Sequence, residues 1–240
     1  MKRRQHCYSL WAALLLTGVG ACKKEVSEDL GIAFVNGVRY YRFTANDRLW
    51  LQANVGDEWR FQNAQGYQRV YRVGQVITRI KEESRSTSMG IPSFSKLLGY
   101  NDLSTVRIGR TDSARGYLEL RFYRDAAKRT NLNSGGYDEN SSRFYAEGED
   151  HEFVGNTDLI SDYFHCRGLK FPSGNALNGP FQQLTVRGRQ YPEVVAFVGA
   201  ARGTTCPAVP SSYMQELYYD RQAGLVRLVS LTGEVWDRVR

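Results

Sequence analysis

Residues 216–239 read ELYYDRQAGLVRLVSLTGEVWDRV, and this stretch carries the clearest structural signal in the chain. Two runs rich in aromatic and branched apolar residues, 216–219 and 225–231, flank a turn that contains Gly224. A second glycine turn leads to a last strand, in which we expect Trp236 to pack into the core. Short runs of this composition, separated by glycine turns, are typical of an antiparallel sheet.

The same period of two recurs in the middle of the chain. Residues 117–123 read YLELRFY, so that Leu118, Leu120 and Phe122 share one face of an extended strand while charged side chains share the other. This alternation predicts a half-buried antiparallel strand. We expect it to form a hairpin with residues 105–110, which also alternate.

Weaker signals extend this prediction over the rest of the chain. Further strands are expected at residues 38–44, 58–62, 68–73, 76–80, 143–147, 182–187 and 193–198. Polar, serine- and glycine-rich stretches predict loops at residues 82–104, with one helical turn over 92–98, and at residues 125–142. The predicted fold class is therefore mainly β: one antiparallel sheet system, curved or arranged as a sandwich or open half-barrel, with roughly ten strands and little helix. We expect a single β-rich domain over residues 32–240.

The N-terminus has the layout of a secretory signal peptide. Lys2, Arg3 and Arg4 precede an uncharged stretch from Tyr8 to Gly20, and small residues follow. The uncharged stretch, about 13 residues, falls short of the roughly 20 that a spanning helix needs. A buried N-terminal helix is the alternative, but it would show polar residues at helical spacing, and this run shows none. We therefore expect residues 1–21 to be removed on export.

The predicted signal peptide ends in Val19-Gly20-Ala21-Cys22, which resembles the lipobox of bacterial lipoproteins. In that family the signal peptidase cuts before the cysteine and the thiol carries lipid, so the resemblance implies lipid attachment at Cys22. The alternative is an ordinary secretory peptide with a chance cysteine. Two or three acyl chains would hold the protein stably at a membrane, whereas one chain alone gives marginal binding. Residues 22–31 would then form a lipidated tether.

Three further features resemble lipoproteins of the Bacteroidetes group. The polar stretch after Cys22 is one, and it implies an outer-membrane location on the periplasmic or the cell-surface face. The segments around Trp59 and Trp236 resemble uncharacterised β-rich lipoproteins of that group, which bring no known activity. Asp112-Ser113-Ala114 resembles a short acceptor motif for O-glycans, which makes Ser113 a candidate modification site.

Charge argues against a nucleic-acid partner. The chain has 32 lysines and arginines against 25 acidic residues, a net charge of +7. Removal of the signal peptide takes away three basic residues and lowers the net charge to +4. Charges of both signs are usual on a soluble surface, and no basic cluster stands beside aromatic platforms as in nucleic-acid-binding modules. We expect no nucleic acid among the partners.

Two cysteines remain in the body of the mature chain, Cys166 and Cys206. In an oxidising compartment an even pair predicts one disulfide, which would close a loop of about 40 residues. Two buried free thiols are the alternative. A metal pair is disfavoured because neither cysteine has a Cys-x-x-Cys partner.

Motifs that would indicate catalysis or a cofactor are weak. Residues 148–152, which include His151, could supply metal ligands, but such a run is more often a solvated loop. Ser93 and Lys96 match Ser-x-x-Lys without the companion motifs of penicillin-binding enzymes. We therefore expect no catalytic residue, no metal and no cofactor.

The sequence leaves three functions open. The first is a non-enzymatic, membrane-tethered domain that binds an envelope protein or a glycan, with exposed tyrosines such as Tyr40, Tyr71 and Tyr218 as candidate contacts. The second is a hydrolase of envelope polymers, which needs two inward carboxylates 5–10 Å apart in a pocket. The third is a carrier of lipid or lipoprotein, which needs an apolar cavity.

Overall fold

A computed structural model describes residues 30–87, 94–112, 117–128, 137–151, 170–171, 177, 181–198 and 214–239. The signal peptide, most of the tether and four candidate residues lie outside the described residues and stay predictions: Cys22, Ser113, Cys166 and Cys206. Within the described part, no helix is both long and apolar enough to span a bilayer. Nearly all of the regular structure there is β-strand, which confirms the predicted fold class.

The strands follow one another along the chain with one short α-helix among them. Their bounds are β1 Ile32–Val35, β2 Val38–Tyr41, β3 Glu58–Gln62, β4 Gln68–Thr87, β5 Phe94–Arg110, β6 Tyr117–Lys128, β7 Tyr137–His151, β8 Lys170–Phe171, β9 Gln182–Val186, β10 Arg189–Val198, β11 Met214–Asp220, β12 Gly224–Ser230 and β13 Val235–Arg238. The helix, α1, covers Ala45–Arg48 and begins with a capping box in which Thr44 and Asp47 bond each other's backbone.

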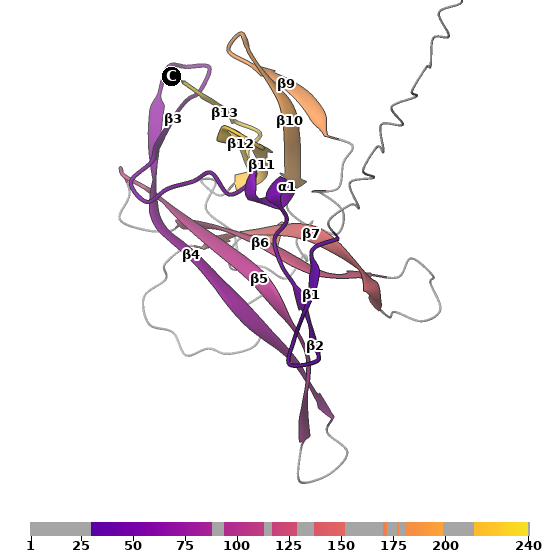
Figure 1. The fold of residues 1–240 in the computed structure, drawn as a ribbon. Helices are drawn as coiled ribbons and strands as arrows, with labels where there is room; N and C mark the ends of the chain where they lie inside the picture. Colours follow the sequence, from indigo (N-terminus) through magenta and orange to yellow (C-terminus); the bar gives the residue numbers. More distant parts are fainter. Residues whose placement is uncertain are drawn as a thin grey trace, which may run out of the picture.

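The thirteen strands of the described residues belong to one sheet. Figure 1 shows how the labelled strands are arranged in space. The order of the sheet is β8-β7-β6-β5-β4-β3-β13-β12-β11-β10-β9, and the β1–β2 hairpin joins it through β5. Neighbours are antiparallel except for a short parallel pairing of β2 with β5. Within the described residues β8 and β9 lie at the two ends of this order, so the sheet is open.

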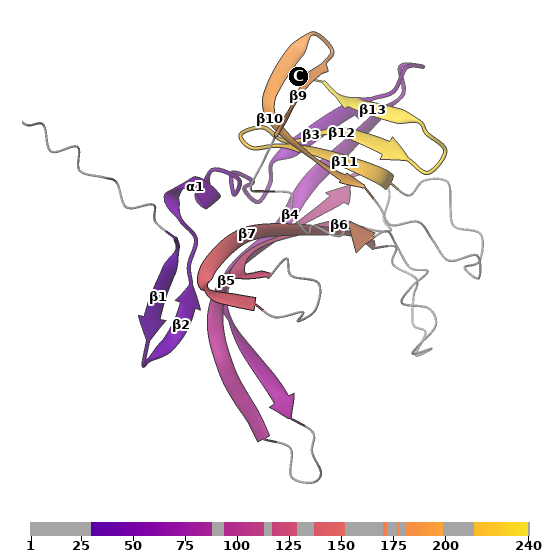
Figure 2. The same ribbon diagram turned by 90° about the vertical axis from the view of Figure 1, so that its right-hand side faces the viewer.

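The sheet bends so that its two halves face each other. Strands β9 to β13 lie above β4 to β7 in Figure 2. The halves are connected through β3, which pairs with β4 on one side and with the last strand, β13, on the other. The β3–β13 pairing is short and joins Gln62 to Asp237 and Phe61 to Arg238.

Aromatic side chains fill the space between the two layers. Trp50, Phe61, Phe122 and Tyr219 are each at most 1% exposed. Phe122 of the lower layer contacts Tyr219 of the upper layer with ring centroids 5.5 Å apart. Packing of this kind across facing sheets removes large apolar surfaces from water and is the main source of stability in such folds.

Several sequence-based expectations are confirmed here. Leu118, Leu120 and Phe122 share the core face of β6, and Trp236 is buried with 4% exposure. The loop predicted at residues 82–104 is wrong where the chain is described, and so is the helical turn, because 82–87 and 94–104 are strand and pair with each other in the β4–β5 ladder. The loop predicted at residues 125–142 is likewise wrong at 125–128 and 137–142, which belong to β6 and β7.

The expectation that Tyr40, Tyr71 and Tyr218 are exposed is wrong for Tyr71. Tyr71 is 3% exposed and packs edge-on against Phe61, with ring centroids 5.6 Å apart, because it shares the core face of β4 with Val73. Tyr40 and Tyr218 are only partly buried.

A buried ion pair fixes the N-terminal segment to the sheet. Arg124 of β6 donates to Asp47 of α1 at 2.6 Å, and its side chain is 10% exposed. Arg124 also donates to the Leu30 carbonyl at 2.9 Å and to the Ser142 hydroxyl at 2.8 Å. Gly31 has a φ of +65° and a Cβ there would lie 2.3 Å from the Arg124 Nε, so only glycine fits beside this arginine.

Candidate functional site

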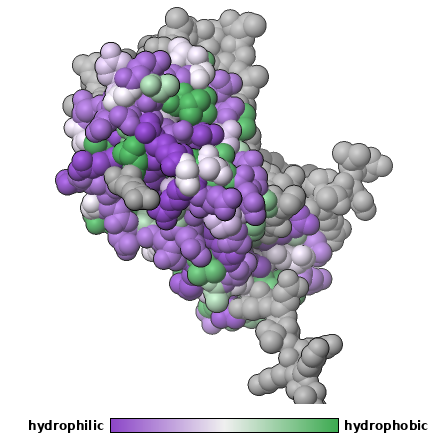
Figure 3. Space-filling model, turned by 90° about the horizontal axis from the view of Figure 1, so that it is seen from above, coloured by the Kyte–Doolittle hydropathy of each residue, from purple (hydrophilic) through white to green (hydrophobic). Residues whose placement is uncertain are grey.

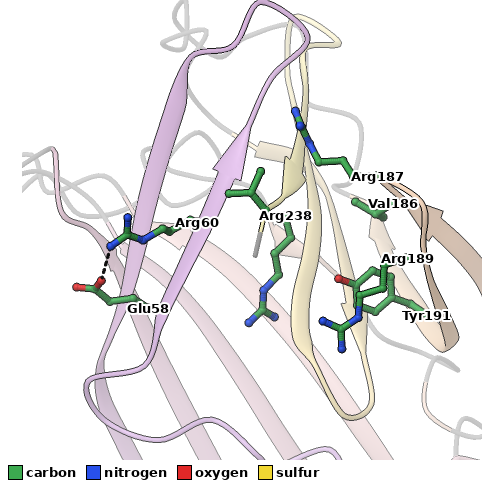
Figure 4. A pocket seen from close by; sticks show the side chains of 8 residues that line it. Glu58, Arg60, Val186, Arg187, Arg189, Tyr191 and Arg238 are labelled. Carbon is green, nitrogen blue, oxygen red and sulfur yellow. Dashed lines mark hydrogen bonds and ion pairs between the residues drawn. The ribbon is translucent and has the colours of Figure 1, made fainter.

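A pocket of about 430 Å³ opens between β3, β13 and the β9–β10 hairpin. Four arginines dominate its lining, and we call it the arginine cleft; its main residues are Arg60, Arg187, Arg189 and Arg238, with Glu58 and Tyr191. The face of the molecule seen in Figure 3 is mainly hydrophilic. Figure 4 shows the guanidinium groups of Arg189 and Arg238 directed toward the same region of the pocket.

The β9–β10 hairpin places two of these arginines. Its two-residue turn is Arg187-Gly188, with φ values of 48° and 78°. Positive φ at both positions is typical of the type I′ turn, whose twist matches that of antiparallel strands. Arg187 lies at the turn, and its side chain donates to the carbonyls of Gln62 and Asn63 at 3.4 Å. Arg189 is the first residue of β10 and therefore lies directly after this turn, close to Arg187.

Arg238 enters the cleft from the final strand. Its guanidinium donates to the carbonyl of Ala223 and, at 3.1 Å, to that of Leu225. It also lies over the ring of Trp59, 5.6 Å from the centroid. Gly224 makes room for this ring, because a Cβ at that position would lie 2.8 Å from Trp59. Burial lowers the pKa of the Arg238 guanidinium.

The positive charge of the cleft exceeds its negative charge. Arg189 lies over the Tyr191 ring at 5.1 Å. Within the described residues neither Arg189 nor Arg238 forms an ion pair with a carboxylate. The single acidic side chain of the lining, Glu58, bonds Arg72 at 2.9 Å and Arg60 at 3.5 Å. In the part of the chain that the structure describes, the cleft therefore presents two oriented guanidinium groups that form no ion pair.

A second hollow of about 330 Å³ adjoins the arginine cleft. It shares Glu58, Arg189 and Arg238 with the cleft and adds the amide side chains of Gln52 and Gln222 and the carboxylate of Asp57. A ligand larger than a single anion could thus extend from the arginines to the two amides, while Asp57 would repel a second negative charge there.

The chemistry of these linings favours binding of an anion over catalysis. Guanidinium groups stay protonated at all physiological pH values and donate paired hydrogen bonds to carboxylate or phosphate. Aromatic rings beneath Arg189 and Arg238 restrict their motion, so less entropy is lost on binding. In the described part of the chain, no group of three or more His, Cys, Asp and Glu side chains is arranged to hold a metal ion.

The arginine cleft was not predicted from the sequence. The candidate residues Cys22, Ser113, Cys166 and Cys206 lie outside the described residues, and His151 is described only as the last backbone position of β7. The local signal that was available is Arg187-Gly188-Arg189 between two predicted strands, which places two cations on one hairpin turn.

Comparison of the chain with protein-family models, with curated proteins and with solved structures finds no match.

Proposed function

We propose that this protein is a lipid-anchored envelope protein whose β domain binds an anionic ligand in the arginine cleft without chemically changing it. The anchor is inferred from the resemblance of Val19-Gly20-Ala21-Cys22 to a lipobox. Binding is inferred from the cleft. The two parts are independent, and each has its own test.

The observation that carries the binding proposal is the pair Arg189 and Arg238. Both side chains are held over aromatic rings at the cleft, and neither forms an ion pair with a carboxylate within the described residues. Arg189 is exposed, whereas Arg238 is partly buried, so the lack of a counter-ion costs stability at Arg238. An incoming carboxylate or phosphate would supply the missing charge and accept hydrogen bonds from both groups.

The interior of the fold gives little support to the carrier alternative. A carrier of lipid needs an apolar cavity, whereas Phe61, Phe122 and Tyr219 fill the space between the layers. The arginine cleft is polar and would not shelter an acyl chain.

The anchor is tested by the intact mass of the protein purified from its native membranes. We expect a chain that begins at Cys22 and carries several hundred daltons of acyl groups. A mass that begins at Met1, or one without acyl groups, would rule out the anchor and leave the cleft unaffected. The same spectrum, taken before and after reduction, reports the Cys166–Cys206 disulfide, and a hexose increment would report a glycan at Ser113.

The cleft is tested by calorimetric titration with two anionic probes, tripolyphosphate and trigalacturonate. We expect the wild-type protein to bind at least one of them, and Arg238→Gln to weaken binding about 10-fold or more, as expected for loss of hydrogen bonds to a charged group. The matched control is Arg227→Gln, because Arg227 is paired with Asp237 outside the cleft lining. Equal affinities for wild type and Arg238→Gln would contradict the proposal. The two probes separate carboxylate from phosphate recognition.

A further inference from the structure

A different pocket, of about 330 Å³, lies on the outer face of the lower layer. It forms near the end of the β5–β6 pairing, where β2 pairs with β5 instead. Its lining comes from β4, β5, β6 and β7, from positions whose side chains point away from the core. We call it the outer pocket. It shares no residue with the arginine cleft.

The outer pocket is balanced in charge. Its lining contains three cations and three carboxylates: Arg79, Lys81 and Arg121 with Glu83, Asp125 and Glu147. Arg121 bonds Glu147 at 3.4 Å, and burial together with the neighbouring Glu83 raises the pKa of the Asp125 carboxyl. A ligand with net charge would disturb this balance, whereas a neutral ligand with many donors and acceptors would not. The arginine cleft differs in this respect, because its lining carries an excess of positive charge.

A buried acceptor in this pocket lacks a donor. Asn101 is 4% exposed, and its Oδ1 atom forms no hydrogen bond in the described structure. Asn101 precedes Leu103 by two residues on β5, and Asp125 follows Tyr123 by two on β6; because Leu103 pairs with Tyr123, the two polar side chains point to the same face. A buried acceptor without a donor destabilises a protein, so its presence beside a pocket indicates that a ligand supplies the donor.

An aromatic surface completes the lining. Tyr123 is partly exposed and is stacked on Tyr145, with ring centroids 5.4 Å apart and an angle of 19° between the planes. Together with Leu103 it adds a small apolar area among the polar groups. Polar side chains that fix orientation beside an aromatic face are a common composition of small-ligand sites, and the volume falls within their usual range.

From these observations we propose that the outer pocket binds a neutral carbohydrate. A turn of the Asn101 amide toward the pocket would let a sugar hydroxyl donate to its Oδ1, other hydroxyls would bond the carboxyl and guanidinium groups, and the C–H face of a ring would lie on Tyr123. Neutral sugars carry donors and acceptors in similar numbers, which matches a lining of balanced charge. The inference is independent of the arginine cleft.

The test is calorimetric titration with neutral trisaccharides of glucose, mannose, galactose and N-acetylglucosamine. We expect at least one to bind the wild-type protein and Asn101→Leu to lose about 10-fold or more in affinity. Thermal unfolding of this variant should occur at the same or a higher temperature, because the substitution removes an unsatisfied buried acceptor. A purely structural asparagine would instead lower the unfolding temperature.

Three comparisons make the result decisive. Gln75→Leu, on the same sheet face but outside the pocket lining, should bind like wild type. Tyr123→Leu should also weaken sugar binding, and this variant tests the proposal if Asn101→Leu does not fold. Arg238→Gln should leave sugar binding intact, which separates this site from the arginine cleft. Failure of all four sugars to bind, or unchanged binding by both outer-pocket variants, would overturn the proposal.

Discussion

Arg124 and Arg238 show two different uses of an arginine in this fold. Arg124 lies between β6 and α1 with a full set of partners: the Asp47 carboxylate, the Ser142 hydroxyl and the Leu30 carbonyl. Arg238 has two backbone carbonyls and the Trp59 ring, but within the described residues no carboxylate. The first arginine holds segments of the chain together, and the second is oriented toward a cleft.

The difference gives a criterion for separating structural cations from ligand-binding ones. A buried ion pair whose hydrogen-bonding groups are satisfied within the protein gains nothing from a ligand. A cation that is oriented only by neutral groups can still form an ion pair with an anionic ligand. By this criterion Arg124 is assigned to the scaffold and Arg238 to the proposed anion site, and the variants below test that assignment.

The largest effect is expected for Asp47→Asn. This change leaves Arg124 buried without its counter-ion, while the asparagine can still accept a hydrogen bond from the Thr44 backbone. Because breaking a buried pair on one side is strongly unfavourable, we expect a loss of about 3–5 kcal/mol in the free energy of unfolding. Denaturant titration measures it, and the β1–β2 hairpin and α1 should lose hydrogen-exchange protection first.

Two further variants sharpen this result. Asp237→Asn breaks the more exposed pair with Arg227, so we expect it to cost about 1 kcal/mol or less. Replacing both members of the buried pair, Asp47→Leu with Arg124→Met, should recover much of the loss because no unpaired charge remains. A single Asp47→Asn variant as stable as wild type would show that Arg124 does not act as described.

The fold could be predicted well where a strand has a packed core behind it. The alternation of Leu118, Leu120 and Phe122 reports that core directly, and so does the C-terminal pattern around Trp236. Residues 82–87 and 94–104 were mispredicted because much of their length projects beyond the core: Ile80 and Leu98, in the same ladder, are 58% and 45% exposed. Their order depends on a partner strand, which a local pattern does not contain.

The arginine cleft was hidden for a related reason. Arg60 and Arg238 meet because β3 pairs with β13, and the sequence signals give strands without their order in the sheet. Each arginine alone looks like an ordinary solvated residue of a strand. The excess of positive charge in the cleft follows from which side chains lie together in the fold, and so does the lack of a donor for the buried Oδ1 of Asn101.

Asp125 is a carboxylate that has another carboxylate, Glu83, beside it. Burial and the neighbouring Glu83 raise the pKa of Asp125 from 3.8 to about 6. A raised acid pKa means that the folded state binds the proton more tightly than the unfolded state. This contribution to stability is complete below about pH 4 and is lost as pH rises through 6.

Asp125→Asn removes that dependence. We expect the variant to match wild type near pH 4 and to be about 1–2 kcal/mol more stable at pH 8, since one pKa unit corresponds to 1.36 kcal/mol and partial solvent access reduces the full value. Denaturant titration at several pH values measures the curve.

Asp112→Asn is a control of opposite sign. The hydrogen bonds from Arg110 lower the pKa of Asp112, so its contribution to stability is present above the unfolded pKa and lost as pH falls. The two variants should therefore diverge from wild type in opposite directions at neutral pH. Parallel curves for wild type and Asp125→Asn would contradict the role given to Asp125.

The smallest effect is expected for Glu58→Gln in the arginine cleft. Glu58 is the acidic side chain that the cleft supplies to its own arginines, and it competes with an incoming anion for Arg60. Its ion pairs are partly exposed, so we expect stability to change by less than about 1 kcal/mol. Affinity for the anionic probe should rise roughly two- to fivefold, because an exposed charge within a few ångströms contributes at most about 1 kcal/mol.

The matched control is Glu139→Gln, which breaks a surface pair with Arg39 on β2, outside the cleft lining. It should leave anion affinity unchanged. An increase that appears with Glu58→Gln alone, and that shrinks at high salt, would mean that the carboxylate limits the charge available in the cleft. A decrease would mean that Glu58 positions Arg60 for the ligand. In that case the cleft would combine both uses of arginine, with Arg60 held by a carboxylate as Arg124 is, and Arg189 and Arg238 left to bind.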